Sequence, residues 1–237
     1  MSNARSRRGT RLTAGGAILG VLVTLLVGAI APANAAIGSA CTGANTQSGA
    51  FSDAGTAANC LKAYGIAKGK NDGTFGEDDN LIRAQFGSFA TRFLTAANVA
   101  HSARTPFSDV NANTVPDANV LKDIEEGHAA GVVNGFTDGT FQPTANMTVS
   151  QAATIVMNLA QAIHKANSNA PDLAPVNDPA TGKPDTAQTY DLAVSKGILD
   201  VNAADKGGTA YPKGKSDTTK RGLFADMLAQ LLQKEVD

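Results

Sequence analysis

The chain has 237 residues, of which 20 are lysine or arginine and 21 are aspartate or glutamate, so its formal net charge at pH 7 is −1. This balance argues against a nucleic-acid-binding protein, because such proteins present a basic surface. The length allows a sizeable core within a single domain.

Residues 1–35 predict an export signal. Four arginines are followed by an apolar stretch at residues 17–31 and by the small-residue cleavage pattern Ala33-Asn34-Ala35. The apolar stretch is shorter than the roughly 20 residues that a membrane-spanning helix needs. The general secretion route is favoured, and the twin-arginine route is the alternative because "SRRGTR" at 6–11 partly resembles its motif. After cleavage the protein is expected to be soluble and exported, without a membrane segment, and to carry a net charge of about −5.

The two cysteines, Cys41 and Cys60, predict a disulfide bond. An even cysteine count in an exported chain favours pairing. In the chain-entropy model, closing a loop of about 20 residues contributes roughly 3 kcal/mol to stability. A lipid anchor on Cys41 is the less favoured alternative, because Gly38-Ser39-Ala40 lacks the large apolar residue that such a motif requires.

A motif recurs along the chain at a fixed period. The fragment "GKNDGTF" at 69–75 returns 66 residues later as "GFTDGTF" at 135–141. A weaker third copy, "GGTAYP" at 207–212, follows Gly197, which itself lies 66 residues after Gly131. Such a period indicates a repeat protein, in which one unit rarely buries its own apolar face. The chain after the leader is therefore divided into unit one (residues 36–103), unit two (104–169) and unit three (170–237).

Each unit is expected to contain a helix, a glycine turn, a polar loop and a second helix. In unit two the first helix is predicted to start at Pro116-Asp117 and to end at Gly131. An extended segment, "FSDV" at 107–110, precedes this helix. The similar "FSDA" at 51–54 is interpreted as a chance echo, because it lies much closer to the glycine turn of its own unit.

The second helix of each unit carries the strongest periodic signal. Apolar residues recur at i, i+3, i+4 and i+7, which is the spacing of one buried helix face. Thr148 or Ser150 is predicted to cap this helix in unit two. The three helices are expected to meet on a common axis. Their stripes are Phe86, Phe89, Ala90, Phe93, Leu94 and Ala97; Ala152, Ile155, Val156, Leu159, Ala160 and Ile163; and Phe224, Met227, Leu228, Leu231 and Leu232.

The repeated pattern resembles the S-layer homology family. Unit two matches through "FSDV" and "GVVNGFTDGTFQPTANMT", unit one through "GIAKGKNDGTF" and "NLIRAQF", and unit three more weakly through "GILDV", "GGTAYP" and "TKRGLF". The resemblance implies a mainly α fold, in which three helix-loop-helix repeats form a pseudo-threefold, three-pronged bundle around a central three-helix core. It also implies that the exported protein binds non-covalently to an anionic, wall-linked glycopolymer at a bacterial cell surface, in grooves between the prongs.

The resemblance further implies that an arginine at the start of the second helix lines each groove. The matching residues are Arg83 in unit one and Arg221 in unit three, whereas Val149 stands there in unit two, whose groove is therefore expected to be impaired. Such an arginine would add its donors to the free N–H groups and the positive end of the helix, an arrangement that suits carboxylate or phosphate. The other residues of the predicted site are Lys68, Lys70, Asp72, Gly73 and Lys220.

Other classes of function have little support in the sequence. The acidic loop around Asp72 lacks EF-hand spacing, and the three histidines lack the paired spacing of a zinc site. No motif for a catalytic nucleophile, a phosphate-binding loop or a dinucleotide is present. We therefore expect no enzyme activity, metal or cofactor. The alternative to wall binding is a structural or adaptor protein that assembles with itself or with other surface proteins.

Overall fold

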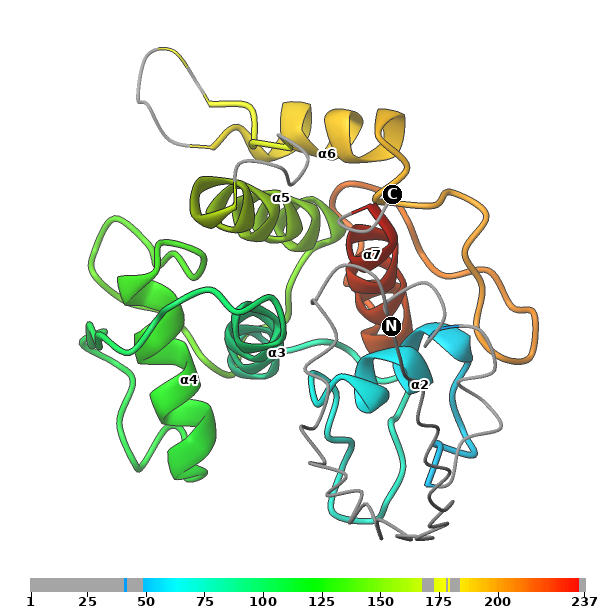
Figure 1. The fold of residues 1–237 in the computed structure, drawn as a ribbon, viewed down its shortest axis with the longest axis horizontal. Helices are drawn as coiled ribbons and strands as arrows, with labels where there is room; N and C mark the ends of the chain where they lie inside the picture. Colours follow the sequence, from blue (N-terminus) through cyan, green and yellow to red (C-terminus); the bar gives the residue numbers. More distant parts are fainter. Residues whose placement is uncertain (1–40, 42–48, 168–172, 178, 180–183, 235–237) are drawn as a thin grey trace, which may run out of the picture. The chain divides into compact units, whose positions relative to one another are not determined.

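The computed structural model describes residues 41, 49–167, 173–177, 179 and 184–234 (Figure 1). They belong to one compact unit, Ala31–Asp237. The predicted export signal and part of the polar linker between units two and three lie outside the described residues. The described part is mainly helical, as predicted, and its β-structure consists of isolated bridges. Its helices are α2 (Thr56–Ala63), α3 (Arg83–Ala96), α4 (Ala118–Ala129), α5 (Val149–Ala166), α6 (Thr186–Ser195) and α7 (Arg221–Lys234).

The helix boundaries predicted in unit two are confirmed. Asp117 caps α4, and its carboxylate accepts a hydrogen bond of 2.9 Å from the Asn119 N–H. Gly131 follows the end of α4 with a φ of +74°, a left-handed conformation that favours glycine. Of the two cap candidates for α5, the structure uses Thr148, which exchanges hydrogen bonds of 3.1 and 3.3 Å with Gln151.

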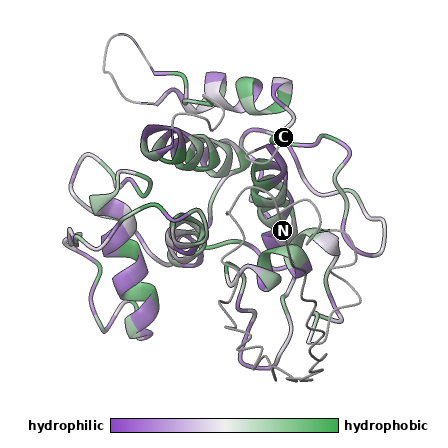
Figure 2. Cartoon of the chain, in the orientation of Figure 1, coloured by the Kyte–Doolittle hydropathy of each residue, from purple (hydrophilic) through white to green (hydrophobic). Residues whose placement is uncertain are grey.

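The three long helices α3, α5 and α7 form the core. Helix α5 contacts both α3 and α7, and the rings of Phe86 and Phe89 on α3 lie 5.9 and 5.8 Å from the ring of Phe224 on α7. Apolar residues are concentrated along α5 and α7 (Figure 2). Within the described ranges, no helix combines the length and hydropathy needed to cross a membrane. The predicted core residues are all buried: Phe89, Phe93, Ile155, Leu159, Leu228 and Leu231.

Each short helix packs on the long helix of a different unit. Helix α4 of unit two packs on α3 of unit one, α6 of unit three on α5 of unit two, and α2 of unit one on α7 of unit three (Figure 1). Close approach is possible between α3 and α4 because Gly87 leaves room for Ile124, whose Cγ1 would lie 2.9 Å from an added Cβ. The three lateral helix pairs are thus each shared between two units.

A closed ring of backbone hydrogen bonds joins the segments that precede the three long helices. The N–H of Leu81 donates to the carbonyl of Thr219 (2.9 Å), that of Thr219 to Met147 (2.8 Å), and that of Met147 to Leu81 (3.0 Å). All three residues are fully buried. These contacts follow the cyclic order that a threefold arrangement requires, while the pseudo-threefold symmetry itself stays a prediction.

The same segments also satisfy the first N–H groups of the long helices. The N–H of Arg83 donates to the carbonyl of Ala145, that of Val149 to Asp217, and that of Arg221 to Asp79, at 2.9–3.0 Å. The expectation that free N–H groups at these helix starts receive an anion is therefore wrong. A carbonyl from another unit already accepts from the first two N–H groups of each long helix, so these groups are not available to an anion.

The "FSDA" segment at 51–54 is a true counterpart of "FSDV", contrary to the expectation of a chance echo. The Asp53 carboxylate accepts hydrogen bonds from the N–H of Phe75 (2.9 Å) and of the next residue (2.8 Å). Asp109 does the same with Phe141 and the residue after it, at 2.7 Å each. In both units this aspartate fixes the end of the Asp-Gly-Thr-Phe turn. Because the helix between the motif and the glycine turn is shorter in unit one, spacing alone concealed the match.

The predicted disulfide between Cys41 and Cys60 is confirmed, with Cα atoms 4.6 Å apart. Cys60 lies on α2 and is fully buried, and Tyr64 packs against the bond. The disulfide therefore ties Cys41, near the start of unit one, to the helix that packs on α7.

Candidate functional site

Two grooves open between a polar loop and the long helix of the same unit. The first groove, of about 450 Å³, lies between residues 68–71 and α3 and reaches the start of α4. The second groove, of about 610 Å³, lies between residues 134–139 and α5 and reaches the start of α6. Their helix positions correspond at the 66-residue period: Gln85 and Gln151, Ser88 and Thr154, Phe89 and Ile155, Arg92 and Asn158.

Each groove receives its arginine from a different unit. Arg221, at the start of α7, lines the first groove, and Arg83, at the start of α3, lines the second. This crossing follows from the hydrogen-bonded ring, which places the start of each long helix beside the loop of another unit. The loop and the arginine of one groove are thus far apart in the sequence.

Arg83 is a buried cation held by backbone and aromatic groups. Its side chain is 5% exposed, and its Nη2 donates to the carbonyl of Asn134 (2.8 Å) and its Nε to that of Phe141. The guanidinium lies 4.7 Å from the ring centre of Phe136 and 4.6 Å from that of Phe141. Burial lowers the pKa of Arg83 to about 10, partly opposed by the charge of Asp109, so the side chain stays cationic at neutral pH. Arg83 forms no ion pair with a described carboxylate.

Arg221 repeats this arrangement in the first groove. It is 4% exposed, its Nε donates to the carbonyl of Phe75 (2.9 Å), and its guanidinium lies 4.8 Å from the Phe75 ring and 5.7 Å from that of Phe89. Burial lowers its pKa, an effect that the charges of Asp79 and Asp53 partly oppose. Among the described residues it too has no ion-pair partner. Both arginines therefore support a loop, and neither forms a direct ion pair with a described carboxylate.

Further cations surround Arg221 in the first groove. Lys68 and Lys70 are exposed on the loop, and Lys70 forms an ion pair of 2.9 Å with Asp79. Arg92 on α3 contacts Asp123 at 3.3 Å, but its Nε is buried and has no hydrogen-bond partner in the described part of the chain. An unpaired buried donor is costly, so this nitrogen is an unusual feature of the groove wall.

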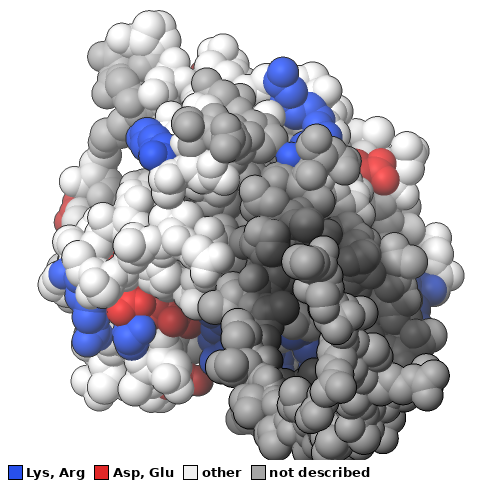
Figure 3. Space-filling view, viewed as in Figure 1, with Lys and Arg blue, Asp and Glu red and all other residues white. Residues whose placement is uncertain are grey.

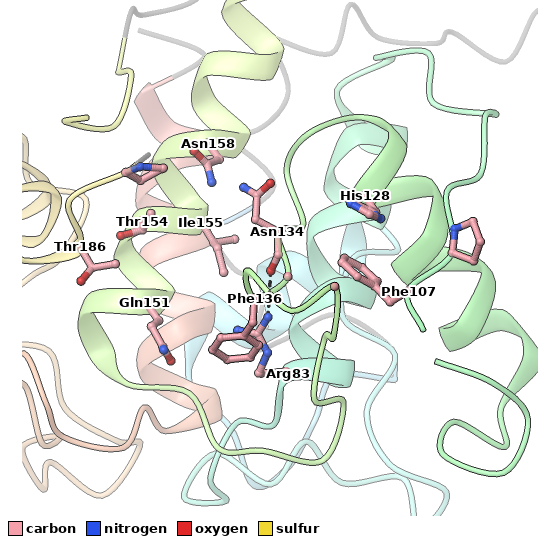
Figure 4. Close-up of a pocket in the computed structure, with 14 residues that line it drawn as sticks. Arg83, Phe107, His128, Asn134, Phe136, Gln151, Thr154, Ile155, Asn158 and Thr186 are labelled. Carbon is pink, nitrogen blue, oxygen red and sulfur yellow. Dashed lines mark hydrogen bonds between the residues drawn. The ribbon is translucent and has the colours of Figure 1, made fainter. Parts of the chain in front are cut away.

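The second groove replaces each of these three cations by an uncharged residue. Its lining contains a stack of Phe107 on His128, with ring centres 3.8 Å apart. Phe136 is 40% exposed there, an unusual state for a large apolar side chain. Many of the side chains around this groove come from α5 and from the loop of unit two, and Arg83, His128 and Thr186 come from α3, α4 and α6 (Figure 4). The replacements, 66 residues on, are Asn134 for Lys68, Phe136 for Lys70 and Asn158 for Arg92.

The other predicted site residues lie outside the linings of these two grooves. Asp72 accepts hydrogen bonds from the N–H and the hydroxyl of Thr74 (2.9 and 2.6 Å), and these bonds lower its pKa. Gly73 has a φ of +82° in the same turn. Lys220 donates to the side chain of Asn80 (2.8 Å). Asp72 and Gly73 thus shape the loop that carries Lys68 and Lys70, and Lys220 joins two units.

Val149 does not line the groove of unit two, which receives Arg83 instead, so the expected link between Val149 and that groove is not seen. The structure places Val149 beside unit three, through the bond from its N–H to the carbonyl of Asp217. Val149 is the helix-start residue that lies beside unit three, so unit three is the unit that receives no arginine from a helix start. There Asp226 stands at the helix position of Ser88 and Thr154, and burial, followed by the charge of Asp200, raises its pKa to about 6. This surrounding does not favour an anionic ligand.

Ion pairs on the remaining surface involve a minority of its described cations. Over α4, basic and acidic side chains lie next to one another (Figure 3). Lys122 forms an ion pair of 2.8 Å with Glu126, and Arg104 pairs with Glu125.

The sequence interpretation did not include Arg92, Phe136 or Asn158. Extending the 66-residue period into the second helices brings Arg92 and Asn158 together as counterparts, so this signal was available. The 66-residue period does not predict that Arg83 lines the groove of unit two, because a sequence period does not show which unit a helix start contacts.

Comparison with known proteins supports the resemblance described above. Residues 106–153 match the model of the S-layer homology domain, so the chain carries such a domain in unit two. The match covers α4, the loop of the second groove and the start of α5. The chain is also 28% identical over 98 residues to Cell surface glycoprotein 1 of Acetivibrio thermocellus, a stretch of 40% of this chain and 4% of that protein. The presence of three tandem repeats stays a prediction.

Proposed function

We propose that this protein is a cell-surface protein anchored non-covalently to the cell wall, and that its first groove binds anionic groups of a wall-linked glycopolymer. The S-layer homology domain at residues 106–153 and the relative named as a cell surface glycoprotein support the location. The predicted export signal agrees with it. The proposal is of a binding protein and not of an enzyme.

The observation that carries the proposal is the unpaired charge in the first groove. Arg221 is 4% exposed and has no described ion pair, and the Arg92 Nε is buried without an acceptor. Buried charges are normally paired, because an isolated one is poorly solvated. A carboxylate or phosphate on a sugar would supply the counter-charge. Lys68 and Lys70, which are exposed on the loop, would attract it from solution.

Sedimentation of the mature protein with purified cell walls tests the proposal. Removing Arg92 or both loop lysines (Arg92→Gln; Lys68→Ala with Lys70→Ala) should weaken wall binding about ten- to a hundredfold, the range for hydrogen bonds to a charged group. Binding should also weaken as salt rises, because exposed ion pairs are screened. Stripping the accessory polymer from the walls should abolish it.

Lys220→Ala is the matched control, because it removes one positive charge from a residue that contacts Asn80 and lines neither groove. It should bind walls like the parent. If the groove variants also bind like the parent, the first groove is not the wall site. If the parent itself fails to sediment with intact walls, the structural or adaptor function takes the place of wall binding.

Arg83 belongs to the same proposal with a second expected effect. It lies in the second groove and holds the loop of unit two through two carbonyls. Arg83→Ala should therefore weaken wall binding and also loosen that loop. Arg83→Lys keeps the charge but loses the forked contact, so comparing the two variants separates the contribution of charge from that of loop support.

A further inference from the structure

We propose that the second groove binds an uncharged sugar ring, which stacks on Phe136 and is hydrogen-bonded by the amide of Asn158. The inference rests on the proposed function in one respect, that the sugar belongs to a wall polysaccharide. It assigns to this groove a ligand of different chemistry from that of the first.

Asn158 carries the first part of the argument. Its side chain is 8% exposed and lines the groove from α5, yet it hydrogen-bonds with no residue in the described part of the chain. An amide offers two donors and an acceptor, and those of Asn158 are open to the groove without a protein partner in the described part of the chain. A ligand that both donates and accepts, as a sugar hydroxyl does, matches these free groups.

Phe136 supplies an apolar platform in the same groove. One side of its ring meets the guanidinium of Arg83 at 4.7 Å, while the side chain as a whole is 40% exposed. Phe136 and Asn158 both border the groove, one from the loop and one from α5 (Figure 4). A concave site with an aromatic surface and a few convergent polar groups is the usual form of a small-molecule site. The C–H face of a pyranose ring suits the aromatic surface and its hydroxyls suit the amide.

Charge distinguishes this ligand from the anion proposed for the first groove. The described lining of the second groove contains no aspartate, glutamate or lysine. Arg83 already donates to the carbonyls of Asn134 and Phe141, and His128 is stacked on Phe107. The groove therefore offers much less positive charge to an anion than the first groove does. Its volume of about 610 Å³ lies within the range of pockets that hold small molecules.

The test is a titration of the mature protein with chitotetraose and cellotetraose as uncharged probes and trigalacturonate as the anionic probe, followed by amide chemical shifts in NMR spectra. Chitotetraose or cellotetraose should shift residues of the second groove, and trigalacturonate should shift those of the first. Phe136→Ala and, separately, Asn158→Leu should weaken binding of the uncharged probe roughly three- to tenfold, the range for one aromatic contact or one hydrogen bond.

Lys70→Ala, a variant of the first groove, is the control and should leave binding of the uncharged probe unchanged. The inference is overturned if neither uncharged probe shifts the second groove, if trigalacturonate shifts it instead, or if both groove variants bind the uncharged probe like the parent. Because this test uses no cell walls, its failure leaves the wall-binding proposal standing. Conversely, loss of wall binding in the first-groove variants does not test whether the second groove binds an uncharged sugar.

Discussion

The first and second grooves share one backbone plan and differ in charge. Their helix positions correspond at a period of 66 residues, and each receives a buried arginine from another unit. The first groove has cations at three positions where the second has two amides and an exposed phenylalanine. The repeat therefore preserves the backbone elements around each groove, whereas a few side chains on one loop and one helix face differ in charge, and we propose that this difference selects the ligand.

The largest expected effect comes from a change that should damage both grooves together. Phe93 is fully buried on α3, which lines the first groove and places Arg83 in the second. Phe93→Ala should lower the free energy of unfolding by about 3–5 kcal/mol, the usual range for a buried aromatic residue. Denaturant unfolding measures this. Phe136→Ala, at a 40% exposed position, should change it by less than about 1 kcal/mol. If Phe93→Ala and Phe136→Ala lowered the free energy of unfolding equally, α3 would not be part of a shared core.

A change in stability with pH, of intermediate size, is expected from unit three. This unit carries Asp226 at the helix position where the two grooves have Ser88 and Thr154. The pKa of Asp226 is raised to about 6 by burial and by the charge of Asp200. The folded state thus holds this proton more tightly than the unfolded chain, so the contribution to stability is greatest below about pH 4 and is lost as the pH rises through about 6. Asp226→Asn should therefore stabilise the protein by on the order of 2 kcal/mol at pH 7 and little at pH 4.

Unfolding in denaturant at several pH values between these limits measures the effect. Asp72→Asn is the control, because the pKa of the exposed Asp72 is lowered by its bonds with Thr74 and should give the opposite trend. If the parent and Asp226→Asn lose stability in parallel as the pH rises, Asp226 is not the group responsible.

The smallest expected effect is on anion binding by the second groove. It tests the comparison of the two grooves directly, because the substitutions give the second groove the cations of the first. Phe136→Lys combined with Asn158→Arg gives the second groove the residues found at the corresponding positions of the first. Binding of trigalacturonate to the second groove should increase roughly tenfold, which corresponds to about 1.4 kcal/mol from the two new solvent-screened charged contacts together. NMR titration at low and high salt measures it. A variant that folds but gains no salt-dependent binding would show that groove charge does not select the ligand.

Much of the fold could be predicted because the relevant signals are local. The apolar stripes of α3, α5 and α7 depend on helical spacing, and the caps at Asp117 and Thr148 depend on side chains next to their own helix. The Cys41–Cys60 bond followed from an even count in a chain expected to be exported.

The arrangement of the site could not be predicted because it depends on which unit contacts which. Periodicity shows that Arg83 starts a helix, but only the structure shows that it reaches the loop of unit two and that Val149 faces unit three. The same limit applies to the helix N–H groups, which seemed free in sequence and are occupied by carbonyls from another unit. "FSDA" was misread because the helix that follows it is shorter, although Asp53 makes the same bonds as Asp109.

The ring of hydrogen bonds between Leu81, Met147 and Thr219 also bears on the order in which the chain can fold. It joins residues as far as 138 positions apart, and contacts of such sequence separation slow folding. In an open solenoid a terminal repeat can be lost while its neighbours stay folded. Here the ring cannot close, and α2 cannot pack on α7, until unit three has been synthesised. The chain is therefore expected to reach its native state late and in one cooperative step, with no single unit able to fold ahead of the others.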